Sequence, residues 1–149
     1  MKLAGMALAL FIGMLLPLQA LINASLGKQT TGPLFASLAS FSVGTGVLCV
    51  WWLLSKPSLD LAALAKVPWW AWMGGVIGAL FVAAATLLIP RMGAAALICL
   101  VVFGQVAGSL LLDHYGVLHA RQPIDSLRLV GALLVVAGAL LVVRPWQHG

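Results

Sequence analysis

Charged residues are scarce in this chain. Only 7% of its 149 residues are Asp, Glu, Lys or Arg, and three of these are acidic. A soluble domain carries roughly 25% charged residues, whereas this chain is 63% hydrophobic with a mean hydropathy of +1.14. The composition therefore excludes an ordinary soluble domain and predicts a membrane protein.

The residue sets that mark catalytic and metal sites are also missing. Cys49 and Cys99 both fall in apolar runs, so we interpret them as small buried hydrophobic residues and not as a disulfide or redox framework. The sequence has no HExxH motif, phosphate loop, paired carboxylates or nucleophile–base set at useful depth. It predicts no enzyme activity, no metal site and no cofactor.

The positive net charge of +5 does not indicate a nucleic-acid partner. The eight lysines and arginines stand singly at the ends of apolar runs, where basic residues anchor membrane helices. With five membrane spans, five of these residues fall on the membrane face where the N-terminus lies: Lys2, Lys56, Lys66, Arg121 and Arg128. The other three, Lys28, Arg91 and Arg144, fall on the opposite face. The positive-inside rule thus favours a cytoplasmic N-terminus by only two residues, which leaves insertion in both orientations open.

Five apolar runs are long enough to cross a bilayer, which takes roughly 20 residues per helix. We expect an all-α integral membrane protein with one transmembrane domain over residues 1–149 and helices at about residues 3–26, 33–54, 69–89, 93–112 and 127–144. The first run is too long for a cleaved signal peptide, and Pro17 inside it predicts a kink. We also expect Ser58 to cap a short surface helix and residues 90–93 to form a tight turn.

Small residues at helical spacing predict close helix packing. Gly104 and Gly108 lie four residues apart, and Gly131 and Gly138 seven apart. Rows of glycine let membrane helices approach closely. The seven-residue spacing of Gly131 and Gly138 suggests that the last helix packs against a partner helix along this line, as in a coiled coil.

Polar side chains inside the first and fourth runs are the candidate functional residues. Gln19 and Asn23 share one helix face, as do Gln105, Ser109 and Asp113. An amide in hydrocarbon needs a partner or water, and Gln105 falls near the midplane. Each set either joins neighbouring helices or lines a polar cavity.

Asp113 is the one carboxylate at a span, since Asp60 and Asp125 fall in loops. If the helix ends at Gly116, a negative charge in its last turn opposes the helix dipole, so we expect Arg121 or Arg128 as its partner. The pair is either an interfacial salt bridge or a coupling or gating device. The nearby His114 and His119 leave proton sensing open, whereas three such groups near the surface form no recognised metal cage.

The whole chain resembles the small five-helix YdcZ-type branch of the drug/metabolite transporter superfamily of bacterial inner membranes. The most specific pieces are PLQALIN with Gln19 and Asn23, GQVAGSLLLD from Gly104 to Asp113, and Arg128 with Gly131. The resemblance implies half of an inverted-repeat transporter, which pairs as a homodimer or with a similar five-helix chain. Four-helix multidrug members of the superfamily carry a coupling glutamate in their first helix, which this sequence lacks.

We therefore predict a small-molecule transporter, an exporter, that works as a dimer by alternating access. Gln19, Asn23, Gln105 and Ser109 are the expected substrate-binding residues, and Asp113 with Arg128 the expected coupling or gating pair. The alternative is a non-transporting membrane subunit of a larger complex. Polar residues in mid-span favour the transporter, because a scaffold needs only small-residue ridges.

Overall fold

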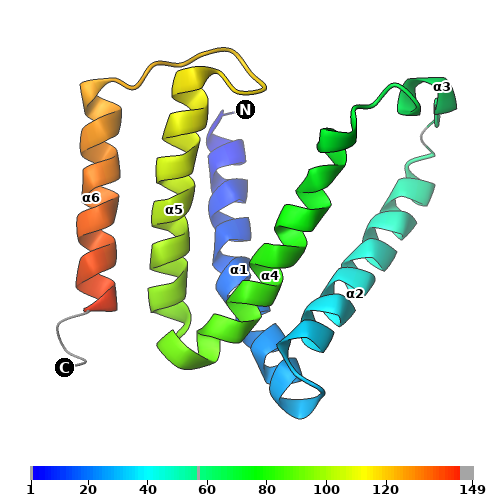
Figure 1. Ribbon diagram of the computed structural model, residues 1–149, viewed down its shortest axis with the longest axis horizontal. Coiled ribbons are helices and arrows are strands. Elements are labelled where there is room, and N and C mark those ends of the chain that lie inside the picture. The colour runs from blue at the N-terminus through cyan, green and yellow to red at the C-terminus, as the bar shows by residue number, and fades with distance from the viewer. Residues whose placement is uncertain (1, 57, 145–149) are drawn as a thin grey trace. The chain divides into compact units, whose positions relative to one another are not determined.

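The computed structural model describes residues 2–56 and 58–144, and these are helical apart from short connections. The elements in chain order are α1 (Lys2–Gln29), α2 (Pro33–Leu54), α3 (Leu61–Leu64), the 3-10 helix η1 (Trp69–Trp72), α4 (Met73–Met92), α5 (Ala94–Tyr115) and α6 (Ser126–Val143) (Figure 1). Five segments are long and apolar enough to span a membrane: α1, α2, η1 with α4, α5 and α6. The predicted all-α fold with five membrane helices is confirmed.

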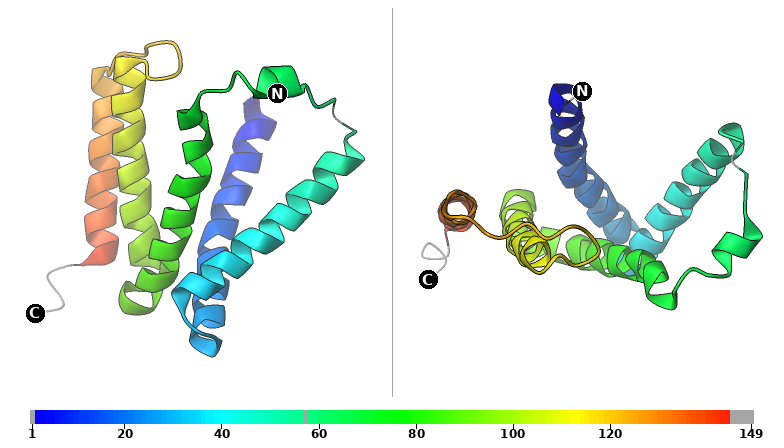
Figure 2. Two further views of the ribbon diagram at one scale, coloured as in Figure 1. Left: turned by 45° about the vertical axis from the view of Figure 1, so that its right-hand side comes forward. Right: turned by 90° about the horizontal axis from the view of Figure 1, so that it is seen from above.

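Three of the membrane helices, α1, α4 and α5, each end three residues later than predicted, at Gln29, Met92 and Tyr115. α1 runs to Gln29 because the polar side chains at its end form hydrogen bonds within the helix. Gln29 Nε2 donates to Ser25 Oγ at 3.1 Å, and the Thr30 hydroxyl donates to the Leu26 carbonyl at 2.7 Å. α5 continues to Tyr115 and ends at Gly116, which adopts the left-handed conformation. Figure 2 shows that α1, with Pro17 inside it, bends along its length.

Two local predictions were wrong. Pro90 and Arg91 belong to α4 and form no tight turn, because a proline near a helix end removes only one backbone hydrogen bond. The helix breaks instead at Gly93, whose φ of 81° is costly for any residue with a Cβ. Asp60, and not Ser58, caps α3: its Oδ1 accepts hydrogen bonds from the amides of Ala62 and Ala63 at 2.9 and 3.1 Å.

The chain divides into two compact units, Met1–Arg91 and Met92–Gly149. In the first unit α1 and α2 form a hairpin that closes at Gly27, where an added Cβ would lie 3.3 Å from the Gly32 carbonyl carbon. The buried residues gather near this turn, on the end of α1, the start of α2 and the end of α4: Ala20, Asn23, Ala24, Ala36, Ser37, Ala85, Thr86 and Ile89. α1 and α2 diverge from there (Figure 2), so the core of this unit lies at one end.

The second unit is the α5–α6 hairpin, whose helices run side by side (Figure 1). Leu97 of α5 and Ala139 of α6 are the buried hydrophobic residues of this hairpin among those described. A shallow groove of about 280 Å³ is lined by Ile98, Cys99, Val102, Val135, Gly138, Ala139 and Val142. Cys99 is half-buried there and Cys49 is exposed on α2, so the prediction that both cysteines are buried was wrong for Cys49.

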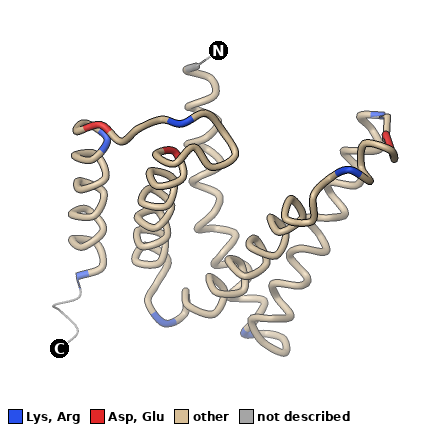
Figure 3. Tube along the Cα trace, turned by 45° about the horizontal axis from the view of Figure 1, so that its top comes forward, with Lys and Arg blue, Asp and Glu red and all other residues tan. Residues whose placement is uncertain are grey.

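Most large apolar side chains of both units are exposed, including Leu10 at 71% and Leu134 at 68%. Such an apolar surface is unstable in water and is expected where lipid or another membrane helix covers it. Lysine and arginine lie near the ends of the long helices or in the connections within each unit (Figure 3). This distribution matches helices whose ends reach the headgroups.

Candidate functional site

A small, partly open cavity with a mainly apolar lining and three polar side chains lies between the three long helices of the first unit. Its volume is about 200 Å³, and its lining is Gln19 of α1, then Ser40, Phe41, Gly44, Thr45 and Leu48 of α2, then Val82 of α4. Three of these side chains are polar, and none is ionisable. The cavity can therefore hydrogen-bond a solute but offers no opposite charge to an ion.

Helical spacing on α2 explains how the cavity forms. Ser40, Gly44 and Leu48 are four residues apart, as are Phe41 and Thr45, so one side of the helix carries all five. A Cβ added to Gly78 of α4 would lie 3.5 Å from Phe41 Cζ. The missing side chain at Gly78 lets the Phe41 ring pack against α4.

Gln19 and Asn23, predicted on one face of the first helix, have different surroundings. Gln19 is exposed and lines the cavity, whereas Asn23 is only 4% exposed in the contact near the turn. The buried Ser37 and Thr86 hydroxyls each donate to a carbonyl of their own helix at 2.8 Å. Among the described residues no hydrogen bond to the Asn23 amide is found.

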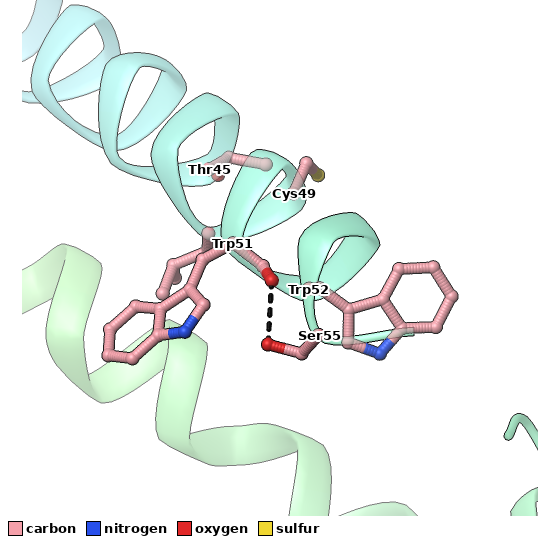
Figure 4. A pocket seen from close by; sticks show the side chains of 6 residues that line it. Thr45, Cys49, Trp51, Trp52 and Ser55 are labelled. Atoms are coloured by element: carbon pink, nitrogen blue, oxygen red, sulfur yellow. Dashed lines mark hydrogen bonds between the residues drawn. The ribbon is translucent and has the colours of Figure 1, made fainter. Parts of the chain in front are cut away.

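A second hollow of about 530 Å³ continues along α2, lined by Thr45, Leu48, Cys49, Trp51, Trp52 and Ser55. It shares Thr45 and Leu48 with the cavity. Figure 4 shows the Trp51 and Trp52 indoles pointing to opposite sides, while the Ser55 hydroxyl donates to the Trp51 carbonyl at 2.9 Å. We call the two hollows together the α2 track. The second hollow is open, and all six of its lining residues belong to α2.

Sequence reasoning missed Ser40 and Thr45 as cavity residues. Serine and threonine in a helix resemble the small residues of a packing ridge, because the hydroxyl can bond to its own backbone. Their spacing relative to Gln19 on another helix carries no signal in the sequence. Only the α1–α2 hairpin brings the three side chains to one cavity.

In the second unit Gln105 and Ser109 are both exposed on α5. The Ser109 hydroxyl donates to the Val106 carbonyl at 3.0 Å, so it is satisfied within its own helix. Gln105 stands in the middle of the α5 span, where an amide needs a polar partner or water. Their assignment to a substrate site stays a prediction.

Asp113, at the end of the same stripe, is held by two groups. Its Oδ2 lies 3.4 Å from Arg128 Nη1, and its Oδ1 lies 3.0 Å from His119 Nε2. Of the two arginines considered, Arg128 contacts the carboxylate, while Arg121 Nε donates to the His114 carbonyl at 2.8 Å. Residues 2–56 and 58–144 contain no group of three His, Cys, Asp or Glu side chains that could hold a metal ion.

The four glycines expected to pack helices have open space around them. A Cβ added to Gly104, Gly108, Gly131 or Gly138 would meet nothing within 4 Å. Close approaches inside the described chain occur at Gly27, Gly78 and Gly116 instead. Gly138 lines the open groove between α5 and α6, so all four predicted glycines leave room for a partner helix.

Comparison with known proteins now identifies the family. The family described as "Putative inner membrane exporter, YdcZ" matches residues 4–141. This chain belongs to the YdcZ family. It is 35% identical over 83 residues to "Inner membrane protein YdcZ" of Escherichia coli (strain K12). That match covers 54% of this chain and 54% of the relative, about half of each. No solved structure matches.

The family match confirms the resemblance to YdcZ-type proteins and extends across all five candidate membrane helices. The chain is a multi-pass inner-membrane protein. The family description is that of an exporter, which supports transport and not catalysis. Within this member of the YdcZ family, the two sets of polar side chains are the α2 track in the first unit and Asp113 with His119 and Arg128 in the second.

Proposed function

We propose that this chain exports a small molecule across the inner membrane and that the α2 track holds part of the substrate path. The observation that carries the proposal is the cavity where Gln19, Ser40 and Thr45 converge in a member of an exporter family. Three polar groups around a cavity of about 200 Å³ can orient a solute while apolar neighbours enclose it.

The substrate is an uncharged molecule with both polar and apolar parts. No ionisable side chain lines the cavity, and Asp113, the one carboxylate at a span, belongs to the other unit. Moving an unpaired ion into an apolar site costs far more than moving a neutral polar group. Phe41, Leu48 and Val82 supply the apolar side of the lining.

Transport proceeds by alternating access in a dimer, with each chain acting as one half of an inverted-repeat transporter. Gln105 supports this arrangement, because its exposed amide in mid-span needs a polar partner that its own hairpin does not supply. The open faces at Gly104 and Gly108 permit close approach of a second chain. Asn23 is buried near the α1–α2 turn and Ser109 bonds its own helix, so their role in substrate binding, like the gating role of Asp113 and Arg128 within the second unit, stays a prediction.

The second candidate is a membrane subunit that does not transport but assembles with a larger complex. The open space at the four glycines lets any partner helix approach closely, so it is as compatible with assembly into a larger complex as with a transporting dimer. A subunit that does not transport would not need a cavity lined by polar side chains. The two functions differ in whether the chain alone moves a solute.

Purified protein in liposomes tests the proposal directly. The panel contains neutral alcohols, polyols and amides, together with cationic and carboxylate analogues of matched size, each measured with and without a pH gradient. We expect the protein to accelerate movement of at least one neutral solute over protein-free liposomes and to leave its charged analogues unmoved. Preference for a cation contradicts the substrate class. Absence of all transport favours the assembly subunit.

A further inference from the structure

The connection between α5 and α6, residues 116–125, folds back over the end of α5. The Gln122 amide donates to the Asp113 carbonyl at 2.8 Å, and Arg121 Nε donates to the His114 carbonyl at 2.8 Å. Arg128 Nη2 donates to Gln122 Oε1 at 2.7 Å. The connection is thus fastened to the last turn of α5 and to the start of α6.

Both ring nitrogens of His119 have an oxygen partner, one on α5 and one on the next residue of the connection. Nε2 lies 3.0 Å from Asp113 Oδ1, and Nδ1 lies 2.9 Å from the Ala120 carbonyl oxygen. A carboxylate oxygen and a carbonyl oxygen both accept hydrogen bonds. A neutral imidazole has one N–H and can donate only one bond, whereas the imidazolium has two. The observed geometry is complementary to protonated His119.

We propose that His119 is a proton-operated clasp that fastens the α5–α6 connection to Asp113 when the imidazole is charged and releases it when the imidazole is neutral. The inference concerns this connection alone and does not rest on the transport proposal. The two contacts of the ring carry it. The clasp closes over the same end of α5 at which the stripe of Gln105, Ser109 and Asp113 finishes.

The backbone beside the clasp is strained in the closed form. Leu118, the residue before His119, has a φ of 66°, which is unfavourable for a residue with a Cβ. Contacts such as those of His119 must offset this strain, so losing one of them favours release. The His119 side chain is 45% exposed, so protons reach it from solvent.

Other charged and titratable groups face the clasp, and one has the opposite response. His114 and Asp113 lie on α5, Arg121 on the connection, and Asp125 and Arg128 on α6. His114 Nδ1 accepts a hydrogen bond from the Ile124 amide at 3.3 Å, so protonation of that nitrogen breaks a contact. Arg128 stays charged and holds the second oxygen of Asp113 throughout. The effect of His119 is therefore cleanest when His114 cannot titrate.

The direction follows from which form fits. Protonation adds the second N–H and the positive charge, so the clasp closes in the protonated form. In the neutral ring Nε2–H can still donate to Asp113, but the Nδ1 bond to the Ala120 carbonyl and the attraction between opposite charges are lost, so the clasp loosens.

Amide hydrogen exchange of the full-length protein in detergent micelles tests the clasp. The background variant is His114→Asn, whose side-chain oxygen replaces the Nδ1 acceptor without titrating near neutral pH. Protection of residues 117–124 is compared at about pH 5.5 and about pH 8, after correction for intrinsic exchange rates. We expect about two- to five-fold higher protection at the lower pH, in keeping with a partly exposed ion pair.

Two further variants decide whether His119 is responsible. His119→Gln and Asp113→Asn, each in the His114→Asn background, should abolish the pH dependence while α5 and α6 stay protected. The proposal is overturned if the background variant has the same protection at both pH values. It is also overturned if His119→Gln keeps the full pH dependence.

Discussion

Replacing Gly116 with alanine should weaken the α5–α6 connection. Gly116 has a φ of 68°, and an added Cβ would lie 3.1 Å from Arg121 Cα and 3.2 Å from Arg121 N. The left-handed conformation costs alanine roughly 1–2 kcal/mol, and displacing the Arg121 backbone adds about 1 kcal/mol. The stiffer unfolded chain offsets about 0.4–1 kcal/mol. The net loss is about 2 kcal/mol, or about 30-fold in an equilibrium constant.

The assay combines denaturant unfolding in detergent with hydrogen exchange of residues 117–124. Gly93→Ala is the matched control, because Gly93 has a φ of 81° but no atom within 4 Å of an added Cβ. Its φ of 81° and ψ of 160° belong to a region that essentially only glycine adopts, so Gly93→Ala should also lower the free energy of unfolding but should leave the connection protected. The reasoning fails if Gly116→Ala leaves exchange in the connection unchanged, or if Gly93→Ala raises that exchange equally.

Three further predictions concern Gln105, Asp113 and Gly138 of the α5–α6 hairpin. Gln105→Leu should abolish solute movement in liposomes without lowering the thermal midpoint, because it removes a hydrogen-bonding group but keeps the bulk; normal transport would show that this amide only joins helices. Asp113→Asn should lower the free energy of unfolding by about 1 kcal/mol in denaturant titrations, because it loses the charge that two partly exposed partners contact; unchanged stability would contradict an ion-pair role. Gly138→Leu should weaken self-association measured by analytical ultracentrifugation in detergent, because a large side chain separates helix backbones; unchanged association would exclude this glycine from the interface.

The parts of the fold that were predictable depend on local composition. Apolar run length is enough to find five membrane helices, but it places the end of α5 at residue 112, whereas the helix continues through polar residues to Tyr115. Pro90 misled because proline punctuates soluble sequences, whereas a membrane helix tolerates it near its end. Asp60 and Ser58 both suit an N-cap, and the two were separable only by where the helix begins.

The polar sites were predictable only in part, because they join residues distant in the sequence. Position along one helix identifies Gln19 as a polar residue in a span, but not that Ser40 and Thr45 of α2 face it. Charge compensation singles out Asp113 and offers two arginines, and the fold of the connection selects Arg128. The same fold brings His119 to the carboxylate, since Leu118 and Gly116 both take left-handed conformations.

The most direct test of the central claim is solute movement by Gln19→Leu in liposomes, compared with Gln29→Leu. Both changes remove a glutamine from α1, but Gln19 lines the cavity, whereas Gln29 is exposed at the helix end and bonds Ser25. We expect Gln19→Leu to lose at least about tenfold in the transport rate of a neutral solute, as for the loss of one solute hydrogen bond worth about 1.4 kcal/mol. Gln29→Leu should transport like the parent, with all three proteins equally folded by thermal midpoint. Equal rates for Gln19→Leu and the parent would contradict a substrate path through this cavity.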